Sequence, residues 1–225
     1  MAAGSAIGPE HVALIGASFG CDDATAQDIA ARARPVRFAA RDTVVAVGEP
    51  GDDTWLLLTG ETQALLYSVA GHAVLLHHFT PGDLFGGATG MPSAEDAEVV
   101  ALLPSDIGRI AEGDFILLMD RHRCVSTTVL RALTRRLGET TQRMVASATL
   151  SAAGRVHAEL LRLARMGDGT TISPPPVLAE LAMVVQSTRE TVSRTVNALE
   201  RSGVIRRSDH ALVVVAPHRL EDLIY

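Results

Sequence analysis

One short segment carries four polar side chains suited to specific hydrogen bonding: Arg189, Glu190, Ser193 and Arg194. Val192, Val196 and Leu199 recur at spacings of three and four, so the segment predicts a helix that buries one apolar face and presents the polar residues on others. Guanidinium groups can donate to guanine, and a carboxylate can accept from the cytosine amino group, in the major groove. The pattern favours base reading over the alternative, a merely solvated helix face.

Signals at both ends support this helix. Ser187 or Thr188 could accept the free amide hydrogens at its start, with Glu190 placed to reach back as a capping box. Gly203 is the expected stop.

The flanking segments complete a helix-turn-helix with a wing. Residues 177–185 predict a preceding helix, with Gln186 and Ser187 as the turn. Residues 204–208 and 211–215 alternate as two strands around a two-residue turn. The candidates for DNA-phosphate contacts are Ser187, Thr188, Arg206 and Arg207.

The run Arg-Glu-Thr-Val-Ser-Arg at 189–194 resembles the Crp/Fnr superfamily of bacterial transcription regulators, and the resemblance extends over nearly the whole chain. It implies that Arg189, Glu190 and Arg194 contact an inverted-repeat operator. Arg189 favours a half-site near TGTGA over one near TTGAT. Gln186 departs from the family, because many members have glycine in this turn.

Between residues 36 and 110, short apolar runs alternate with Gly, Pro and Asp turns, which is typical of a sandwich or jelly roll. The pattern resembles the β-roll sensor domain of the same superfamily. We therefore expect an α+β protein with a jelly-roll sensor domain at 1–111, a dimerisation helix at 112–149 and a winged helix-turn-helix domain at 150–225.

The effector pocket implied by the resemblance is altered. The turn Pro81–Gly86 matches the family, but Gly87 stands where a ribose-binding Glu is usual, and residues 94–98 are acidic where an Arg-Ser pair would bind phosphate. We do not expect cyclic AMP to bind in the usual way, although a neutral ligand or an unusual purine stays open. The candidate pocket residues are Gly86, Gly87, Ala97, Thr140 and Thr141, of which the two threonines are equally explained as polar residues of a helical seam.

The segment 112–149 carries apolar residues at alternating spacings of three and four, which suits two packed helices. The residues of this seam are Leu130, Leu133, Leu137 and Met144. The resemblance implies a homodimer, whose two-fold symmetry would match an inverted repeat. The alternative is that the seam packs against the chain's own β-roll.

Two cysteines, Cys21 and Cys124, lie far apart in the sequence, which argues against a disulfide framework and fits a reducing cytoplasm. They are too few for an iron-sulfur cluster. Cys124 stands near the start of the predicted dimer helix, where it is either a redox switch or an inert buried thiol.

Haem stays open as an alternative cofactor, because members of the superfamily include haem sensors. The candidate axial ligands are His11, His72, His77, His78 and His122. A competing class is a cupin-like enzyme, but His77 and His78 are adjacent and would point to opposite faces of a strand. We find no catalytic or metal-ligand motif and expect neither an enzyme nor a metal site.

The net charge of −6 at first opposes nucleic-acid binding. Residues 1–149 hold 11 Arg and 18 acidic residues, whereas residues 150–225 hold 9 Arg and 8 acidic residues, so the acidity lies away from the predicted DNA-binding module. No apolar run reaches membrane-spanning length, and we expect a cytoplasmic protein without a membrane partner. RNA polymerase would be a further partner of an activator, and a regulator that is always competent for DNA is the other possibility within the superfamily.

Overall fold

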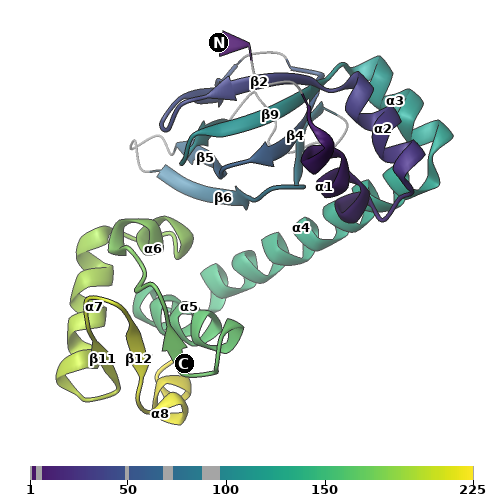
Figure 1. Cartoon of the computed structure of the whole chain (residues 1–225). Helices are drawn as coiled ribbons and strands as arrows, with labels where there is room; N and C mark the ends of the chain where they lie inside the picture. Colours follow the sequence, from purple (N-terminus) through teal and green to yellow (C-terminus); the bar gives the residue numbers. More distant parts are fainter. Residues whose placement is uncertain (1, 4–6, 49–50, 68–72, 88–96, 225) are drawn as a thin grey trace. The chain divides into compact units, whose positions relative to one another are not determined.

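The computed structural model describes residues 2–3, 7–48, 51–67, 73–87 and 97–224. The chain divides into two compact units, Met1–Gly138 and Glu139–Tyr225, each with its own hydrophobic core (Figure 1). Among the described residues, no helix is long and apolar enough to cross a membrane.

The first unit is a sandwich of two antiparallel sheets with helices on one side (Figure 1). The strand orders are β1-β2-β9-β4-β7 and β3-β8-β5-β6. The elements, in chain order, are β1 (Ala2–Ala3), α1 (Pro9–Phe19), α2 (Asp23–Arg32), β2 (Arg34–Phe38), β3 (Thr43–Val45), β4 (Thr54–Thr59), β5 (Thr62–Tyr67), β6 (Ala73–Phe79), β7 (Leu84–Gly86), β8 (Ala97–Ala101), β9 (Ser105–Ile110), α3 (Glu112–Arg121) and α4 (Arg123–Thr149). The jelly-roll prediction is confirmed.

The strand β4 shows why this unit has three layers. Its side chains alternate, so Trp55 and Leu57 join the cluster between the two sheets, while Leu56 and Leu58 join the cluster formed with the helices. A strand buried on both faces needs an almost continuous apolar sequence, as β4 has.

The segment 112–149, which the sequence predicts as a single helix, forms the two helices α3 and α4. His122 between them has extended backbone angles. Its ring lies 2.9 Å from the Asp28 carboxylate and 3.4 Å from the Thr25 hydroxyl, both on α2. These contacts between residues distant in sequence favour the break, and a periodicity argument cannot anticipate them.

The second unit is a winged helix-turn-helix domain. A three-stranded sheet of order β10-β12-β11 packs with the helices around one core, to which α5, α6 and α7 each contribute. The elements are α5 (Ala152–Met166), β10 (Thr171–Ile172), α6 (Leu178–Val184), α7 (Arg189–Arg201), β11 (Ile205–Arg207), β12 (Leu212–Val214) and α8 (Pro217–Asp222).

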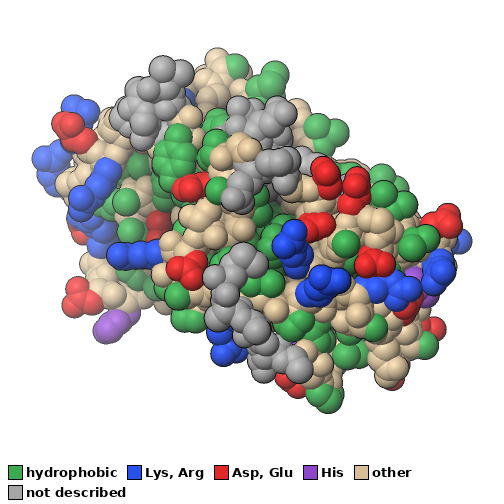
Figure 2. All heavy atoms as spheres, turned by 90° about the horizontal axis from the view of Figure 1, so that it is seen from above, with side chains coloured by type: hydrophobic (Ala, Val, Ile, Leu, Met, Phe, Trp, Pro, Cys, Tyr) green, Lys and Arg blue, Asp and Glu red, His purple; other side chains and the backbone are tan. Residues whose placement is uncertain are grey.

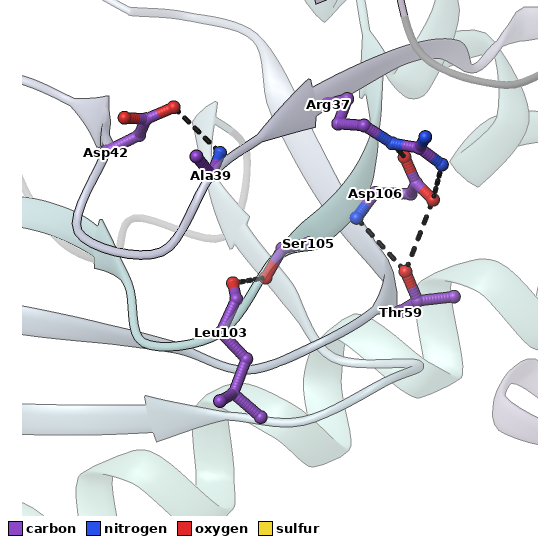
Figure 3. A network of polar contacts seen from close by, with 7 residues as sticks. All are labelled: Arg37, Ala39, Asp42, Thr59, Leu103, Ser105 and Asp106. Carbon is purple, nitrogen blue, oxygen red and sulfur yellow. Dashed lines mark hydrogen bonds and ion pairs between the residues drawn. The ribbon is translucent and has the colours of Figure 1, made fainter.

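A polar network on the first unit joins three neighbouring strands at their ends (Figure 3). The Arg37 guanidinium on β2 donates two hydrogen bonds of 2.8 Å to the Asp106 carboxylate on β9. The Asp106 amide donates to the Thr59 hydroxyl on β4 at 3.1 Å. Asp106 therefore stabilises the order β2-β9-β4 through both its side chain and its backbone.

We expect this network to make the first unit sensitive to acid. The hydrogen bonds from Arg37 hold the pKa of Asp106 below its ordinary value of 3.8. A lowered folded-state pKa means that the stabilisation is complete above the ordinary value and is lost as the pH falls through the lowered one. Asp106→Asn should therefore reduce the fall in thermal midpoint between neutral pH and about pH 2. Asp120→Asn, at an exposed position on α3, is the control, and equal falls for wild type and both variants would contradict the prediction.

Candidate DNA interface and sensor domain

The helix α7 buries one face and exposes the predicted base-reading residues on the others. Val192, Val196 and Leu199 are almost fully buried in the core of the second unit. Arg189 and Glu190 lie exposed in the first turn of α7. Arg194 is exposed one turn later, and Ser193 is half-buried. The side chains suited to DNA thus lie on a rigid helix and not on a loop.

The start of α7 is capped by Thr188, one of the two expected residues. Its hydroxyl accepts the Thr191 amide hydrogen at 3.2 Å. The second side chain at this cap is Thr191, whose hydroxyl lies 3.0 Å from that of Thr188, and not Glu190 as the capping-box hypothesis had it. Glu190 therefore lies exposed beside Arg189, near the amides at the helix start that could meet a phosphate.

The turn between α6 and α7 explains the unusual Gln186. This residue has a φ of 51°, in the left-handed region that favours glycine. The Ser187 amide donates to Ala182 O at 2.9 Å, and the Gln186 amide donates to Met183 O at 3.4 Å, which is the Schellman pattern for ending a helix. The turn therefore keeps the geometry of a glycine turn without a glycine.

Arg155 on α5 holds this turn, a role that the sequence analysis did not identify. Its guanidinium donates to three backbone carbonyls: Val185 O at 2.8 Å, Gln186 O at 3.1 Å and Leu150 O at 3.1 Å. Because helix ends leave carbonyls without intrahelical partners, one fork-shaped donor satisfies the end of α6 and the turn together. No short motif marks such a residue, since its acceptors are backbone atoms 30 and 31 residues away.

We expect Arg155→Ala to destabilise the second unit by about 2 kcal/mol, because it removes several charge-assisted hydrogen bonds from carbonyls at a helix end. Urea unfolding followed by circular dichroism measures the effect. Arg162→Ala on the same helix is the matched control, because Arg162 is 56% exposed and pairs only with its surface neighbour Glu159 and the Met166 sulfur. That loss should stay below about 1 kcal/mol, and equal losses would show that Arg155 has no special role.

The wing forms as predicted, and its two arginines differ. Ile205 pairs with Val214, and Arg207 pairs with Leu212, around the turn at 208–211. Arg206 is exposed.

Arg207 points back to the recognition helix. It donates to the Asn197 side chain at 2.7 Å and to the Glu200 carboxylate at 2.9 Å, and it holds the pKa of Glu200 below its ordinary value. Arg207 thus joins the wing to α7, while Arg206 is the more available of the two for phosphate.

Basic and acidic side chains are mixed on the surface that Figure 2 draws, rather than separated into patches of one sign. An interface of this composition depends on well-placed contacts more than on a strong general field.

The predicted pocket residues lie on different elements. Gly86 ends β7 and Gly87 follows it, both with positive φ, whereas Ala97 begins β8 in the other sheet. Thr140 and Thr141 are exposed on the part of α4 that belongs to the second unit. The acidic positions 94–96 lie outside the described residues.

The backbone leaves no room for a side chain at Gly87. A Cβ there would collide with the Asp52 carbonyl oxygen, and one at Gly86 would lie 2.8 Å from Asp53 O. The position where related pockets have a ribose-binding Glu is therefore packed tightly against the chain.

A buried guanidinium attaches α4 to the sandwich. Arg136 is only 3% exposed, donates a hydrogen bond to Leu84 O on β7, and lies with its guanidinium carbon 5.3 Å from the centre of the Phe79 ring. The sequence analysis did not single out Arg136, because an arginine on a helix is usually solvated.

The candidate haem ligands have local contacts. His11 Nδ1 accepts the Gly8 amide hydrogen at 3.1 Å, and His78 lies 3.2 Å from Glu61. His72 lies outside the described residues. Within the described ranges, no three His, Cys, Asp or Glu side chains gather as a metal site.

A jelly roll followed by a long helix and a winged helix-turn-helix defines a class of ligand-responsive DNA-binding regulators. Two family models match the chain: a cyclic nucleotide-binding domain at residues 35–122 and a Crp-like helix-turn-helix domain at residues 154–223. The chain belongs to the Crp/Fnr family of DNA-binding transcription regulators.

Relatives support this assignment over most of the chain. The "CRP-like cAMP-activated global transcriptional regulator" of Mycobacterium tuberculosis is 26% identical over 220 residues, covering 94% of this chain and 97% of the relative. The "Cyclic AMP receptor protein" of Thermus thermophilus is 28% identical over 179 residues, covering 79% and 82%. The solved structure of the "c-di-GMP Responsive Global Regulator CLP" of Xanthomonas campestris has a TM-score of 0.74 at 18% identity, covering 85% of this chain and 99% of that one.

Proposed function

We propose that the protein is a homodimeric regulator that binds an inverted-repeat operator through α7. The observation that carries the proposal is the exposure of Arg189, Glu190 and Arg194 around the start of a helix whose opposite face is locked into the core. In a major groove, the arginines would donate to guanine, and Glu190 would accept from a cytosine amino group. Ser193 would make an adjacent base contact.

Contacts to the DNA backbone would fix the register of this helix. Ser187 and Thr188 stand at the N-terminus of α7, where free amides favour an anion. Arg206 would contact phosphate from the wing. Arg207 would do so only in exchange for part of its contact with Asn197 and Glu200.

The second copy would pack along α4. The helix turns Val125, Val129 and Arg136 inward, where they are buried by the chain's own first unit. A different stripe stays exposed: Leu130 (63%), Leu133 (37%), Leu137 (69%) and Met144 (72%). Exposed apolar residues in a heptad-like register suit the same stripe on a two-fold-related helix, which favours the dimer over packing on the chain's own roll.

The sensor domain would not hold cyclic AMP in the usual way. The tight packing at Gly87 and the acidic sequence at 94–98 both oppose a ribose phosphate. A different effector at Gly86, Gly87, Ala97, Thr140 and Thr141 is one alternative. Haem, a redox signal and a regulator that is always competent for DNA are the others. Cytoplasmic DNA, and RNA polymerase for an activator, complete the proposed partners.

Selection of bound sequences from a random duplex library, with and without cyclic AMP, tests the proposal. We expect enrichment of an inverted repeat with TGTGA-like half-sites in the absence of the nucleotide. Enrichment only with cyclic AMP would overturn our interpretation of the pocket, and enrichment of a single half-site would overturn the dimer.

A further inference from the structure

The two cysteines, 103 positions apart in the sequence, come together in the first unit. Cys21 lies in the turn between α1 and α2, and Cys124 lies in the first turn of α4. Both are free and half-buried, and both pack against the same hydrophobic cluster beneath the helices. The sequence analysis took their separation along the chain as evidence against pairing, and the fold removes that separation.

Contacts on both sides of Cys124 hold the two segments together. Four residues after it, the Thr128 hydroxyl donates to Phe19 O at the end of α1, at 3.3 Å. Two residues before it, His122 lies 2.9 Å from the Asp28 carboxylate on α2. Cys124 therefore sits between two anchored points that face the α1–α2 turn.

The protonation chemistry of Cys21 agrees with direct contact between the sulfurs. Burial, and next the neighbouring Cys124, raise the pKa of the Cys21 thiol to about 11. At neutral pH, Cys21 thus keeps its proton and can donate it in a hydrogen bond to the Cys124 sulfur. A thiol that receives such a bond is favoured as the thiolate, which is the form that attacks an oxidant.

We propose that Cys21 and Cys124 form a reversible intrachain disulfide when the protein meets a hydroperoxide. The Cys124 thiolate would attack the peroxide oxygen and become a sulfenic acid, with release of one water from hydrogen peroxide. The Cys21 sulfur would then attack the sulfenic sulfur, forming the S–S bond and displacing hydroxide, which leaves as water with the Cys21 proton. In total, two thiols lose two electrons and two protons, and the peroxide is reduced to two waters.

The product would tie the α1–α2 turn to the first turn of α4 by a covalent bond. The proposal is independent of operator binding, because it concerns only the sulfur chemistry of the first unit.

Peptide mapping of the full chain tests the pairing. Every basic residue is Arg, so trypsin releases Cys21 in a peptide that ends at Arg32 and Cys124 in a peptide of residues 124–131. After a stoichiometric dose of hydrogen peroxide, mass spectrometry without reductant should find these two peptides joined and two hydrogens lighter than their sum. Dithiothreitol should separate them, and a non-reducing gel should show a single chain.

Two controls isolate the effect of the fold. The same peroxide dose given to the urea-unfolded chain should yield at least several-fold less of the joined peptide, because only folding brings the sulfurs together. Cys21→Ser should leave Cys124 as a sulfenic acid that reacts with dimedone. Equal yields from folded and unfolded chain, disulfides between chains, or sulfinic acid on either cysteine without the joined peptide would each overturn the proposal.

Discussion

Replacing Arg194 by alanine is expected to lower affinity for the selected operator by about 5- to 150-fold, equivalent to about 1–3 kcal/mol, while affinity for random DNA falls little. Arg194 is exposed on a helix whose inner face is held by Val192 and Val196, so the substitution should leave the domain folded. What disappears is a donor pair for one base. Preference at that base pair should be relaxed, which a set of operators varied at each position would detect by fluorescence anisotropy.

Arg206→Ala is the matched comparison, because it removes the same charge from the wing. It should weaken specific and random DNA alike and reduce the slope of log affinity against log salt by about one. If Arg194→Ala also lowered both affinities equally, its proposed base contact would be wrong.

Placing a charge in the exposed seam of α4 is expected to have a still larger effect on the operator. Leu130→Glu should convert the dimer to a monomer, because two carboxylates would meet across a two-fold contact in place of two leucines. A monomer binds one half-site without the gain from linkage, so affinity for the inverted repeat should fall by about 100-fold or more. Leu130 is 63% exposed in the single chain, and its loss should therefore leave the chain's own stability nearly unchanged.

Sedimentation equilibrium and anisotropy together measure this effect. Gln142→Glu adds the same charge at an exposed position of α4 outside the seam and should remain a dimer. Affinity for an isolated half-site should be similar in all three proteins. A Leu130→Glu protein of dimeric mass would exclude the α4 seam as the dimer contact.

The features that sequence predicted well are those with local periodic signals. The apolar stripe of α7, its cap at Thr188 and the hairpin of the wing all depend on residues a few positions apart. The alternation of short runs likewise predicted the jelly roll, because strands that face a core repeat every second residue.

The features that sequence missed depend on partners distant along the chain. The break at His122 is stabilised by α2, and the attachment of Arg155 uses carbonyls at a helix end 30 residues away. Arg207 is assigned to phosphate by its charge, but the fold places it against Glu200. In each case the residue type gives the chemistry that is available, and only the fold selects the partner.

The attachment of Arg136 makes the first half of α4 a mechanical extension of the sheet. A hydrogen bond to Leu84 O and contact with the Phe79 ring connect β7 and β6 to the helix without an intervening flexible loop. A shift of β7 would therefore displace α4 at this point, or else strip a buried cation of its contacts at a cost of several kcal/mol. Two positions further on, Gly138 marks the boundary between the compact units, and glycine is the residue at which a helix bends most readily. Stiff coupling up to Arg136 followed by a compliant residue is the arrangement of a crank joined to a hinge.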